Sequence, residues 1–556
     1  MRRRKKQAGL TVNAVAGTHV VFFGLDLAAA KRAGCRGFAF QRRDHDEGDS
    51  IWLRGLKTFE QTEPHPAAGE TFSTLHQPIQ GFQWADYSVH PGTTYTYTVV
   101  ALYGDPADLQ QRIAVDVEVT TENEVGPVHS AFFNRGSVAT QEYARRFQNQ
   151  PPNVAGPGAY EWLSRGLLEA FKAFLERAGA GWEVHGAMYE FQWQDALGAV
   201  RAAHQRGAEV HMLFDDMGPS KPNRTAIGAA HIKALCRGRI HGKLMHNKFF
   251  VLSRNGIPQA VWTGSTNLTE NGIFGHANVG HIVEDGAIAQ EFRDYWERLA
   301  ADPPVAPPYR EANEQASPAP PSPWKAVTSA VFSPRGTELD ALQWYADIAA
   351  SAKQGLFMTF AFGMNEKFRD AYRMDDDVLR LALMEKEWGN PKTKAQELAA
   401  LQQIRNRRNV VVAVGNRIVT NSFDRWLAEM SKLEPVVNVY WVHLKFMLVD
   451  PLGPRPTVVT GSANFSKAST DTNDENMLVI RGDKRIADIY FGEYLRLYSH
   501  YAFRESVKIY MEKKKHGTVE DWKPQHLVAD DSWMAPYFDP QDRSARDIRR
   551  RYFSGA

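Results

Sequence analysis

The sequence predicts an α/β protein with two lobes that repeat one another. Each lobe is expected to contain mixed, largely parallel sheets, and an all-β sandwich domain precedes them. The first 125 or so residues are rich in β-branched and aromatic residues, whereas helical and strand patterns alternate from about residue 155. This alternation stops at a proline-rich stretch and then starts again. At 556 residues, the chain is also too long for a single hydrophobic core.

Residues 1–125 are predicted to form the β-sandwich. Residues 18–23 and 95–100 carry β-branched and aromatic side chains, and Pro91-Gly92 supplies a turn before the second stretch. Residues 90–99 resemble the late part of a fibronectin type III domain, in which a proline-glycine turn leads into a strand that bears tyrosine. This resemblance implies an antiparallel sandwich.

Both lobes are expected to be built from βαβ units. In the first lobe, residues 126–302, we expect helices at 162–178, 195–205 and 288–299 and strands at 183–191, 209–214 and 246–252. In the second lobe, residues 326–500, we expect helices at 337–353 and 486–498 and strands at 356–362, 409–414 and 443–449. Because the two halves follow one order, we interpret them as an internal duplication.

Two further segments complete the predicted organisation. Residues 303–325 contain eight of the chain's 29 prolines and are expected to form an extended linker without a core of its own. Residues 501–556 form a C-terminal extension in which a charged stretch precedes several aromatic residues. We interpret the extension as a surface helix followed by an arm packed on the body, with a lid over the functional site as the alternative.

One short polar motif occurs twice with the same internal spacing. His246-Asn247-Lys248 precedes Gly264-Ser265-Thr266-Asn267, and His443-Leu444-Lys445 precedes Gly461-Ser462-Ala463-Asn464. In both copies the Gly-Ser pair begins 18 residues after the histidine. A core that merely tolerates histidine would not repeat this spacing with polar residues, so we interpret the copies as two half-sites of one functional site.

The residue types in these copies fit phosphodiester chemistry. One neutral imidazole can attack phosphorus while the other, protonated, donates to the leaving oxygen. The lysines would neutralise the non-bridging oxygens, the asparagines would donate hydrogen bonds to them, and the serines would position these groups. No step requires a metal ion or a cofactor. The residues predicted to act in this way are His246, Lys248, Ser265, Asn267, His443, Lys445, Ser462 and Asn464.

The second copy resembles the signature of the phospholipase D superfamily. Residues 443–450 read His-x-Lys-x4-Asp, ending at Asp450, and residues 461–464 resemble the usual companion of that signature. Residues 474–480 resemble the segment in which an acidic residue, here Glu475, bonds the catalytic histidine. The resemblance covers about residues 155–500. It implies a bilobal α/β fold with one active site at the lobe interface and a structural role for Asp450.

The first copy departs from this signature at two positions. Ser253 stands where the second copy has Asp450, and alignment of the downstream segments places Ala277 opposite Glu475. A carboxylate raises the basicity of a histidine and fixes its tautomer. We therefore predict that His443, with Glu475 as its partner, is the nucleophile, and that His246 is the general acid.

Other polar residues near the motifs are expected to have structural roles. His241 and Lys243 form a second His-x-Lys pair, but no Gly-Ser-x-Asn follows it at the same spacing. His276 and His281 are expected to pack at the back of the first lobe. Asp215 and Asp216 end a predicted strand, where acidic pairs are more often helix caps than metal ligands.

The resemblance implies a phosphodiester substrate without separating lipids from nucleic acids. Our first prediction is phospholipase D-type hydrolysis of a phospholipid at a membrane surface, releasing phosphatidic acid and the head group. The first alternative is an endonuclease that cleaves DNA or RNA, for which Arg2 to Lys6 and Arg405 to Arg408 offer candidate phosphate contacts. The second alternative is a phosphate-binding protein that has lost catalysis.

The composition sets only broad limits. A net charge of +2 is below the usual basic excess of nucleic-acid-binding proteins, and two cysteines are too few for a disulfide scaffold. The basic start at Arg2 to Lys6 lacks the apolar block of a secretory signal, so we expect a flexible tail. No apolar run is long enough to span a membrane. We expect a soluble, cytoplasmic protein, with secretion as the alternative because β-domains of this kind are common outside cells. A monomer suffices because one chain carries both half-sites.

Overall fold

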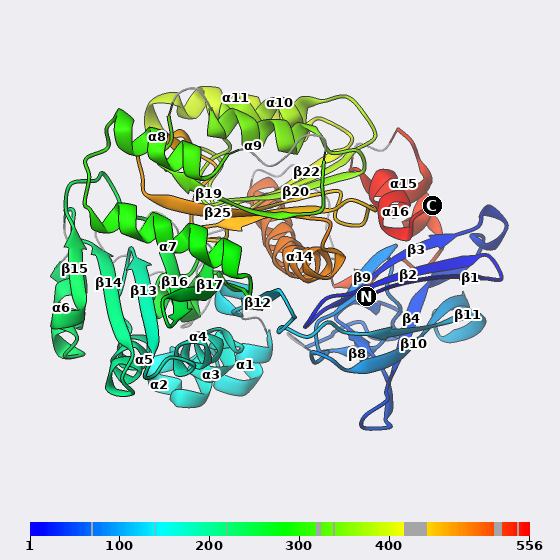
Figure 1. Ribbon diagram of the computed structural model, residues 1–556. Coiled ribbons are helices and arrows are strands. Elements are labelled where there is room, and N and C mark those ends of the chain that lie inside the picture. Colours follow the sequence, from blue (N-terminus) through cyan, green and yellow to red (C-terminus); the bar gives the residue numbers. More distant parts are fainter. Residues whose placement is uncertain are drawn as a thin grey trace.

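The computed structural model describes residues 1–67, 70–138, 141–218, 221–318, 324–336, 340–415, 442–515, 525–541 and 544–556. An antiparallel β region lies beside two lobes, each built around a seven-stranded sheet (Figure 1). In this view the second lobe lies above the first, and the β region, in blue, lies at the lower right.

The N-terminal β region consists of two four-stranded antiparallel sheets. One has the order β1 (Arg2–Gln7), β2 (Leu10–Ala16), β3 (Val21–Leu27) and β9 (Gln83–Asp86), and the other β11 (Asp108–Thr120), β10 (Thr94–Asp105), β4 (Cys35–Asp44) and β5 (Ser50–Trp52). Alternate residues of β11 are buried, because only one face of this strand lies on the core. Phe23 and Phe40, from the two sheets, meet with ring centroids 5.3 Å apart.

The prediction of a flexible tail at Arg2 to Lys6 was wrong. These residues form β1, which pairs with β2 from Arg2 opposite Val15 to Gln7 opposite Leu10. The Nε of Arg2 also donates to Asp488 Oδ1 at 2.7 Å. Main-chain pairing does not depend on apolar side chains, and a charged edge strand also discourages pairing with another chain.

The two lobes share one strand order. The first sheet runs β12 (His129–Phe133), β18 (Val279–Val283), β17 (Ile257–Gly264), β16 (Lys248–Arg254), β13 (Trp182–Met188), β14 (Glu209–Asp215) and β15 (Cys236–Arg239). The second runs β19 (Thr328–Ser333), β25 (Glu475–Arg481), β24 (Thr457–Gly461), β23 (Phe446–Val449), β20 (Gly355–Phe360), β21 (Leu379–Met384) and β22 (Val410–Val414). The repetition inferred from the sequence therefore extends to the topology.

Both sheets are mixed, as predicted, but parallel pairing is in the minority. Among the described residues, β13–β14–β15 and β20–β21–β22 pair in parallel, whereas the other four pairings of each sheet are antiparallel. The expectation of largely parallel sheets was wrong. Strands β16 and β17 are joined by the two residues Asn255 and Gly256, and so short a connection allows only an antiparallel hairpin.

Helices pack around both sheets. In the first lobe these include α4 (Leu167–Glu176), α5 (Gln194–Gln205) and α7 (Gly286–Ala300), and in the second α9 (Ala341–Ala350), α10 (Glu366–Arg373), α11 (Lys394–Arg405) and α14 (Lys484–Lys515). In the part of the chain that is described, no helix is apolar over the length that a bilayer crossing needs.

The segment between the lobes is not extended throughout. Helix α8 (Pro307–Ala316) occupies much of it, and Tyr309 and Asn313 of this helix are buried. The prediction of an extended linker was therefore wrong over α8. Proline is well tolerated in the first turn of a helix, where its missing N–H has no intrahelical partner, so a proline-rich composition did not exclude a helix here.

The lobes are joined directly beside the motif histidines. Met245 forms a parallel bridge with Asp474, and Val442 forms one with Ala277, so the residue before each motif histidine pairs with the opposite lobe. The main-chain N–H of His246 also donates to the carbonyl of Asp474 at 2.9 Å. These reciprocal contacts bring the two half-sites together at the lobe interface.

The C-terminal extension packs on the N-terminal β region. Strand β26 (His526–Leu527) pairs in parallel with β7 (Thr58–Phe59), and the indole Nε1 of Trp533 donates to the carbonyl of Cys35 at 3.0 Å. Helix α16 (Arg546–Ser554) lies against β3. The described residues of the extension thus form an arm on the body, as the sequence indicated, rather than a lid.

Candidate active site

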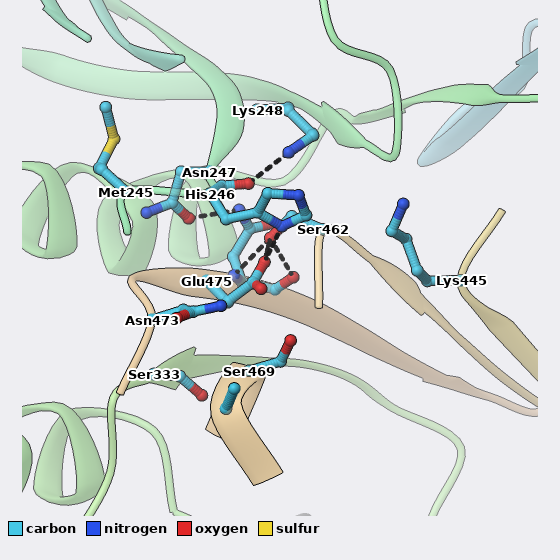
Figure 2. A network of polar contacts seen from close by, with 12 residues as sticks. Met245, His246, Asn247, Lys248, Ser333, Lys445, Ser462, Ser469, Asn473 and Glu475 are labelled. Carbon is cyan, nitrogen blue, oxygen red and sulfur yellow. Dashed lines mark hydrogen bonds and ion pairs between the residues drawn. The ribbon is translucent and has the colours of Figure 1, made fainter. Parts of the chain in front are cut away.

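His246 is paired with a carboxylate from the opposite lobe. Its Nδ1 lies 2.9 Å from Glu475 Oε2, and Ser462 Oγ donates to the same oxygen at 2.7 Å (Figure 2). Both residues of this pair are buried, and Glu475 has no exposed surface. Burial alone would raise the pKa of Glu475, but His246 and Lys248 hold it below its usual value. The carboxylate is therefore ionised and accepts the Nδ1 proton of His246, which leaves Nε2 as the acceptor nitrogen.

His443 is paired with an amide instead. Its Nδ1 lies 2.8 Å from Asn278 Oδ1, to which Ser265 Oγ also donates at 2.8 Å. The Nδ2 of Asn278 donates to the carbonyl of Gly272 at 2.8 Å, which fixes the amide orientation. The two half-sites thus have the same geometry, but one histidine has an anionic partner and the other a neutral one.

This arrangement corrects two predictions about Glu475: which residue of the first copy corresponds to it, and which histidine it bonds. The structural counterpart of Glu475 is Asn278, not Ala277, because each accepts from the serine of its own Gly-Ser pair. The sequence alignment was shifted by one residue, since it matched Asn278 to Asn476. Glu475 also bonds the histidine of the other lobe, because the lobes face each other across the site. The premise on which His443 was chosen as the nucleophile is therefore wrong.

Burial favours the neutral form of both imidazoles. Burial lowers the pKa of His246 to about 4, although Glu475 opposes the shift. Burial also places the pKa of His443 well below its usual value, with further lowering by Lys445 and His276. The pKa is lowered for both histidines, but only His246 has a carboxylate that favours its protonated form.

The two motif lysines are buried near both histidines. Each donates from Nζ to the carbonyl of its own motif histidine at 2.5 Å, Lys248 to His246 and Lys445 to His443. Burial lowers the pKa of Lys248 to about 8 and that of Lys445 well below its usual value. Two lysines in so dry a site favour the binding of an anion, because the anion would stabilise their charged forms.

The asparagines of the two copies differ in their surroundings. Asn267 Nδ2 donates to Glu190, a residue that follows strand β13. The adjacent Tyr189 has its ring centroid 5.0 Å from that of His246. Neither Tyr189 nor Glu190 was predicted as a site residue. Both lie within the strand expected at 183–191, which in fact ends at Met188, and no motif marked them.

A third histidine contacts the site. The rings of His276 and His443 are stacked with centroids 5.4 Å apart, and His276 Nε2 lies 2.8 Å from Asn271 Nδ2. The expectation that His276 packs at the back of the first lobe was wrong. His281 is part of a buried chain with His129 and Tyr490, at 2.9 and 3.0 Å.

Asp450 accepts hydrogen bonds from the main chain. The carboxylate of Asp450 accepts from the N–H groups of Lys353, Gln354 and Gly355 at 2.7–3.0 Å. Its counterpart Ser253 is buried.

The strand-end acids of the first lobe have partners within the protein. Asp215 accepts from the N–H of Met245 at 2.8 Å, Asp216 pairs with Arg224, and His241 pairs with Asp302. Among the described residues, no group of acidic, histidine and cysteine side chains could hold a metal ion.

Comparison with known families supports the two-lobed organisation. Residues 174–300 and 392–496 match a family model described as "Cardiolipin synthase, PLD-like domain". The two matched segments lie one in each lobe. No curated relative matches the chain.

The solved structures that resemble this chain include proteins that are named for different activities. Phosphatidylserine synthase of Haemophilus influenzae Rd KW20 is 10% identical with a TM-score of 0.43, over 64% of this chain and 94% of that chain. Polyphosphate kinase of Porphyromonas gingivalis is 12% identical with a TM-score of 0.37, and the match covers 58% of this chain but only 43% of the kinase. Nuc of Salmonella typhimurium, a phospholipase D family member, is 20% identical with a TM-score of 0.23, over 31% of this chain and 95% of that chain. At these TM-scores, the likenesses carry no argument about the substrate.

Proposed function

We propose that this chain is a metal-independent phosphodiesterase that works through a phosphohistidine intermediate. The observation that carries the proposal is the reciprocal pairing across the lobes, in which His246 contacts Glu475 and His443 contacts Asn278. Two histidines with oriented Nδ1 atoms, beside two buried lysines, fit in-line attack on an anion. The bound phosphodiester would return negative charge to the site and raise the pKa of both lysines and of His443.

The nucleophile in this proposal is His246. Its Nδ1 proton is held by an ionised carboxylate, which increases the electron density at Nε2 and stabilises the imidazolium character that develops during attack. His443 has only a neutral amide on Nδ1, so its protonated form loses the Nε2 proton more readily. That property suits a general acid. This assignment reverses the one expected from the sequence.

The reaction would proceed in two steps. Nε2 of His246 forms a bond to phosphorus, the bond to the leaving oxygen breaks, and His443 donates its Nε2 proton to that oxygen. His443 then takes a proton from water, the resulting hydroxide attacks phosphorus, and the bond to His246 breaks. Lys248 and Lys445 would stabilise the charge on the non-bridging oxygens throughout.

Within this reaction class, our first choice of substrate is a phospholipid, hydrolysed to phosphatidic acid and a free head group. The endonuclease alternative relies on surface cations, and two of those near residue 405 have carboxylate partners. Arg405 pairs with Glu505 at 2.6 Å, and Arg408 pairs with Asp377 at 2.6 Å. Cations already paired in this way have less to gain from a nucleic-acid backbone.

The proposal extends to the N-terminal β region, which we assign to a fibronectin type III-like class on the turn at Pro91-Gly92 that leads into β10. Such modules are docking units in many proteins, and here the region would place the lobes at a surface. We also propose that residues 126–302 and 326–500 act as the two halves of one catalytic body.

The test is a comparison of substrates in excess EDTA. Phosphatidylcholine and phosphatidylethanolamine vesicles would be compared with single- and double-stranded oligonucleotides, using the wild type, His246→Ala and His443→Ala. We expect head-group release that both substitutions abolish. Oligonucleotide cleavage with intact lipids would favour the endonuclease, and no cleavage of any diester would favour a binding protein.

The nucleophile can be identified separately. Rapid denaturation in alkali during turnover, which preserves the acid-labile phosphorus–nitrogen bond, followed by peptide mass analysis, is expected to find the added phosphoryl group on His246, most abundantly in His443→Ala with a substrate whose leaving group needs no proton. A phosphoryl group on His443 would reverse the assignment.

A further inference from the structure

The residue before Glu475 is a second buried carboxylate, and the mechanism above gives its side chain no role. Asp474 has no exposed surface, and its two carboxylate oxygens accept hydrogen bonds from two different parts of the chain. We propose that Tyr309 and Arg239 are positioning residues for His246, and that they act through Asp474. This inference rests on the proposed phosphodiesterase function and adds the residues that hold its nucleophile in place.

The main chain of Asp474 is bonded on both sides to the segment that carries His246. Its N–H donates to the carbonyl of Leu244 at 2.9 Å, and its carbonyl accepts from the N–H of His246 at 2.9 Å. The next residue, Glu475, contacts the Nδ1 of the same histidine at 2.9 Å. The backbone and the imidazole of His246 are therefore both bonded to the dipeptide Asp474-Glu475. A shift of this dipeptide would disturb both at once.

The side chain of Asp474 joins three parts of the structure. The hydroxyl of Tyr309 donates to Oδ1 at 2.9 Å, and the Nε of Arg239 donates to Oδ2 at 3.1 Å. Tyr309 lies in α8 between the lobes, Arg239 ends β15 of the first lobe, and Asp474 precedes β25 of the second. The guanidinium carbon of Arg239 also lies over the Tyr309 ring, 5.6 Å from its centroid. These bonds fix the dipeptide relative to both lobes and to the helix that connects them.

Arg239 is itself held by a second carboxylate. It has no exposed surface, and its Nη1 donates to Asp302 Oδ1 at 2.6 Å. The same oxygen accepts from the N–H groups of Ile240 and His241 at 3.1 Å each. A guanidinium can bond two carboxylates at fixed angles, whereas the ammonium of a lysine is a single point charge. Arginine is therefore the residue type that suits this place between Asp302 and Asp474.

The opposite half-site has no such support from its corresponding residue. Ala277 bridges to Val442 as Asp474 bridges to Met245, so Ala277 stands in the equivalent place. An alanine side chain has no hydrogen-bonding group. The additional support therefore lies on the side of His246, which must attack phosphorus in line with the leaving oxygen. Small errors in such an alignment lower the rate of reaction strongly.

The charge of Asp474 depends on its two partners. Burial raises the pKa of Asp474 to about 6, while Arg239 and the hydroxyl of Tyr309 oppose the rise. An ionised carboxylate accepts shorter and stronger hydrogen bonds than a neutral acid. Loss of either partner is therefore expected to weaken the bond that the other one makes.

The experiment starts with the full chain and p-nitrophenyl ethyl phosphate, a soluble phosphodiester. Tyr309→Phe removes one hydroxyl and is the mildest change. We expect kcat to fall about 5- to 20-fold and KM to change about twofold or less, because Tyr309 aligns the nucleophile without contacting the substrate. Arg239→Lys keeps the charge but cannot bond both carboxylates in the same way, and it should lower kcat about 10- to 100-fold.

Two control variants make the same chemical changes elsewhere in the second lobe. Tyr372 is buried, and its hydroxyl donates to the carbonyl of Leu381 at 3.0 Å. Arg380 is buried and pairs with Asp376. Tyr372→Phe and Arg380→Lys are expected to lower Tm by amounts similar to the test variants while kcat stays within about twofold of the wild type.

Two further measurements separate positioning from stabilisation. In protein with ¹⁵N-labelled histidine, the Nδ1 proton of His246 is assigned by its loss in His246→Ala. Its resonance should shift or broaden in Tyr309→Phe and stay in place in Tyr372→Phe. In addition, Tyr309→Phe should cost less kcat in the Asp474→Asn background than in the wild type, because both changes weaken one contact.

The outcomes distinguish this proposal from the proposed function. A Tyr309→Phe protein with a lower Tm but unchanged kcat and an unchanged His246 resonance would overturn the positioning role. Additive losses in the double variant would also overturn it. No turnover of the aryl ester by the wild type would instead contradict the phosphodiesterase function, and the His246 resonance would then decide the positioning role by itself.

Discussion

The two half-sites share one frame but differ in the groups that surround it. Each has a histidine, a lysine and a Gly-Ser-x-Asn turn at the same spacing, and in each the serine fixes the group that bonds the opposite histidine. That group is a carboxylate for His246 and an amide for His443. The difference teaches that a repeated frame can give its two histidines different partners through one pair of corresponding side chains, while the strand order stays the same.

The largest loss of activity is expected from Glu475→Gln. The substitution keeps an acceptor for His246 Nδ1 but removes the charge that stabilises the imidazolium. We expect kcat to fall roughly 10²- to 10⁴-fold, by analogy with the loss of a carboxylate behind a catalytic histidine. Single-turnover kinetics with an aryl phosphodiester would measure it. Asn278→Ala is the matched change in the other half-site and should cost about tenfold; equal losses in the two variants would remove the proposed division of roles.

The second prediction concerns the motif acid that only one copy retains. Asp450→Ala leaves the N–H groups of Lys353, Gln354 and Gly355 without their acceptor. We expect the free energy of unfolding of the second lobe to fall by about 2–3 kcal/mol. Thermal unfolding followed by circular dichroism would detect it as a lower Tm. Ser253→Ala, at the corresponding position of the first lobe, is expected to change Tm little, and a larger drop there would contradict the comparison.

The third prediction is that acid weakens the first lobe before the second. His185 in β13 stands opposite Val251, where Phe357 in β20 stands opposite Leu448. Burial, with Arg293 and His211, lowers the pKa of His185 to about 3 from an ordinary value of 6.5. The unfolded chain then binds the proton more tightly than the folded one. Stability is therefore lost as pH falls below about 6.5, by up to about 1.4 kcal/mol per pH unit until about pH 3.

Hydrogen exchange at pH 7 and pH 4.5, corrected for intrinsic rates, would measure this effect. Amides of β13 should lose protection at the lower pH while those of β20 keep it. His185→Phe places the second lobe's residue in the first lobe and should remove the difference. Unchanged protection of β13 in the wild type would show that the histidine is not responsible.

The smallest loss of activity is expected at His276, which stacks on His443, whereas the ring beside His246 is that of Tyr189. His276→Ala should lower kcat about three- to tenfold, the range expected for the loss of an aromatic pair, whereas His276→Phe should retain most of it. Since His276 lowers the pKa of His443, the Phe variant should move the limb of the pH–rate profile that reports His443 to higher pH. A profile identical to that of the wild type would show that the stacking has no electrostatic role.

Spacing alone identified the repeated histidines, lysines, serines and asparagines, because these residues lie in two short segments of fixed length. It did not reveal that Glu475 bonds His246, because the spacing of residues within one motif does not show which residues of the other lobe they contact. One overlooked signal was available: the offset that separates His246 from His443 also separates Asn278 from Glu475. Applying it would have found Asn278.

The fold class was predictable from the alternation of helices and strands along the sequence. The prediction that the strands pair mostly in parallel was wrong. The Asn255-Gly256 pair is a strong hairpin signal between β16 and β17, and both residues have positive φ, 50° and 78°. Glu190 and Tyr189 could not have been found in this way. Their place depends on how a loop after β13 bonds to another loop distant in sequence.

The arm that packs on the N-terminal β region has a consequence for biosynthesis. The indole of Trp533 bonds the carbonyl of Cys35 across a separation of 498 residues, and its ring stacks on Phe82. A ribosome exposes the strands of the first region long before it makes the tryptophan. Translation must therefore reach the arm before the apolar surface around Phe82 is covered, and until then that surface stays open to chaperones.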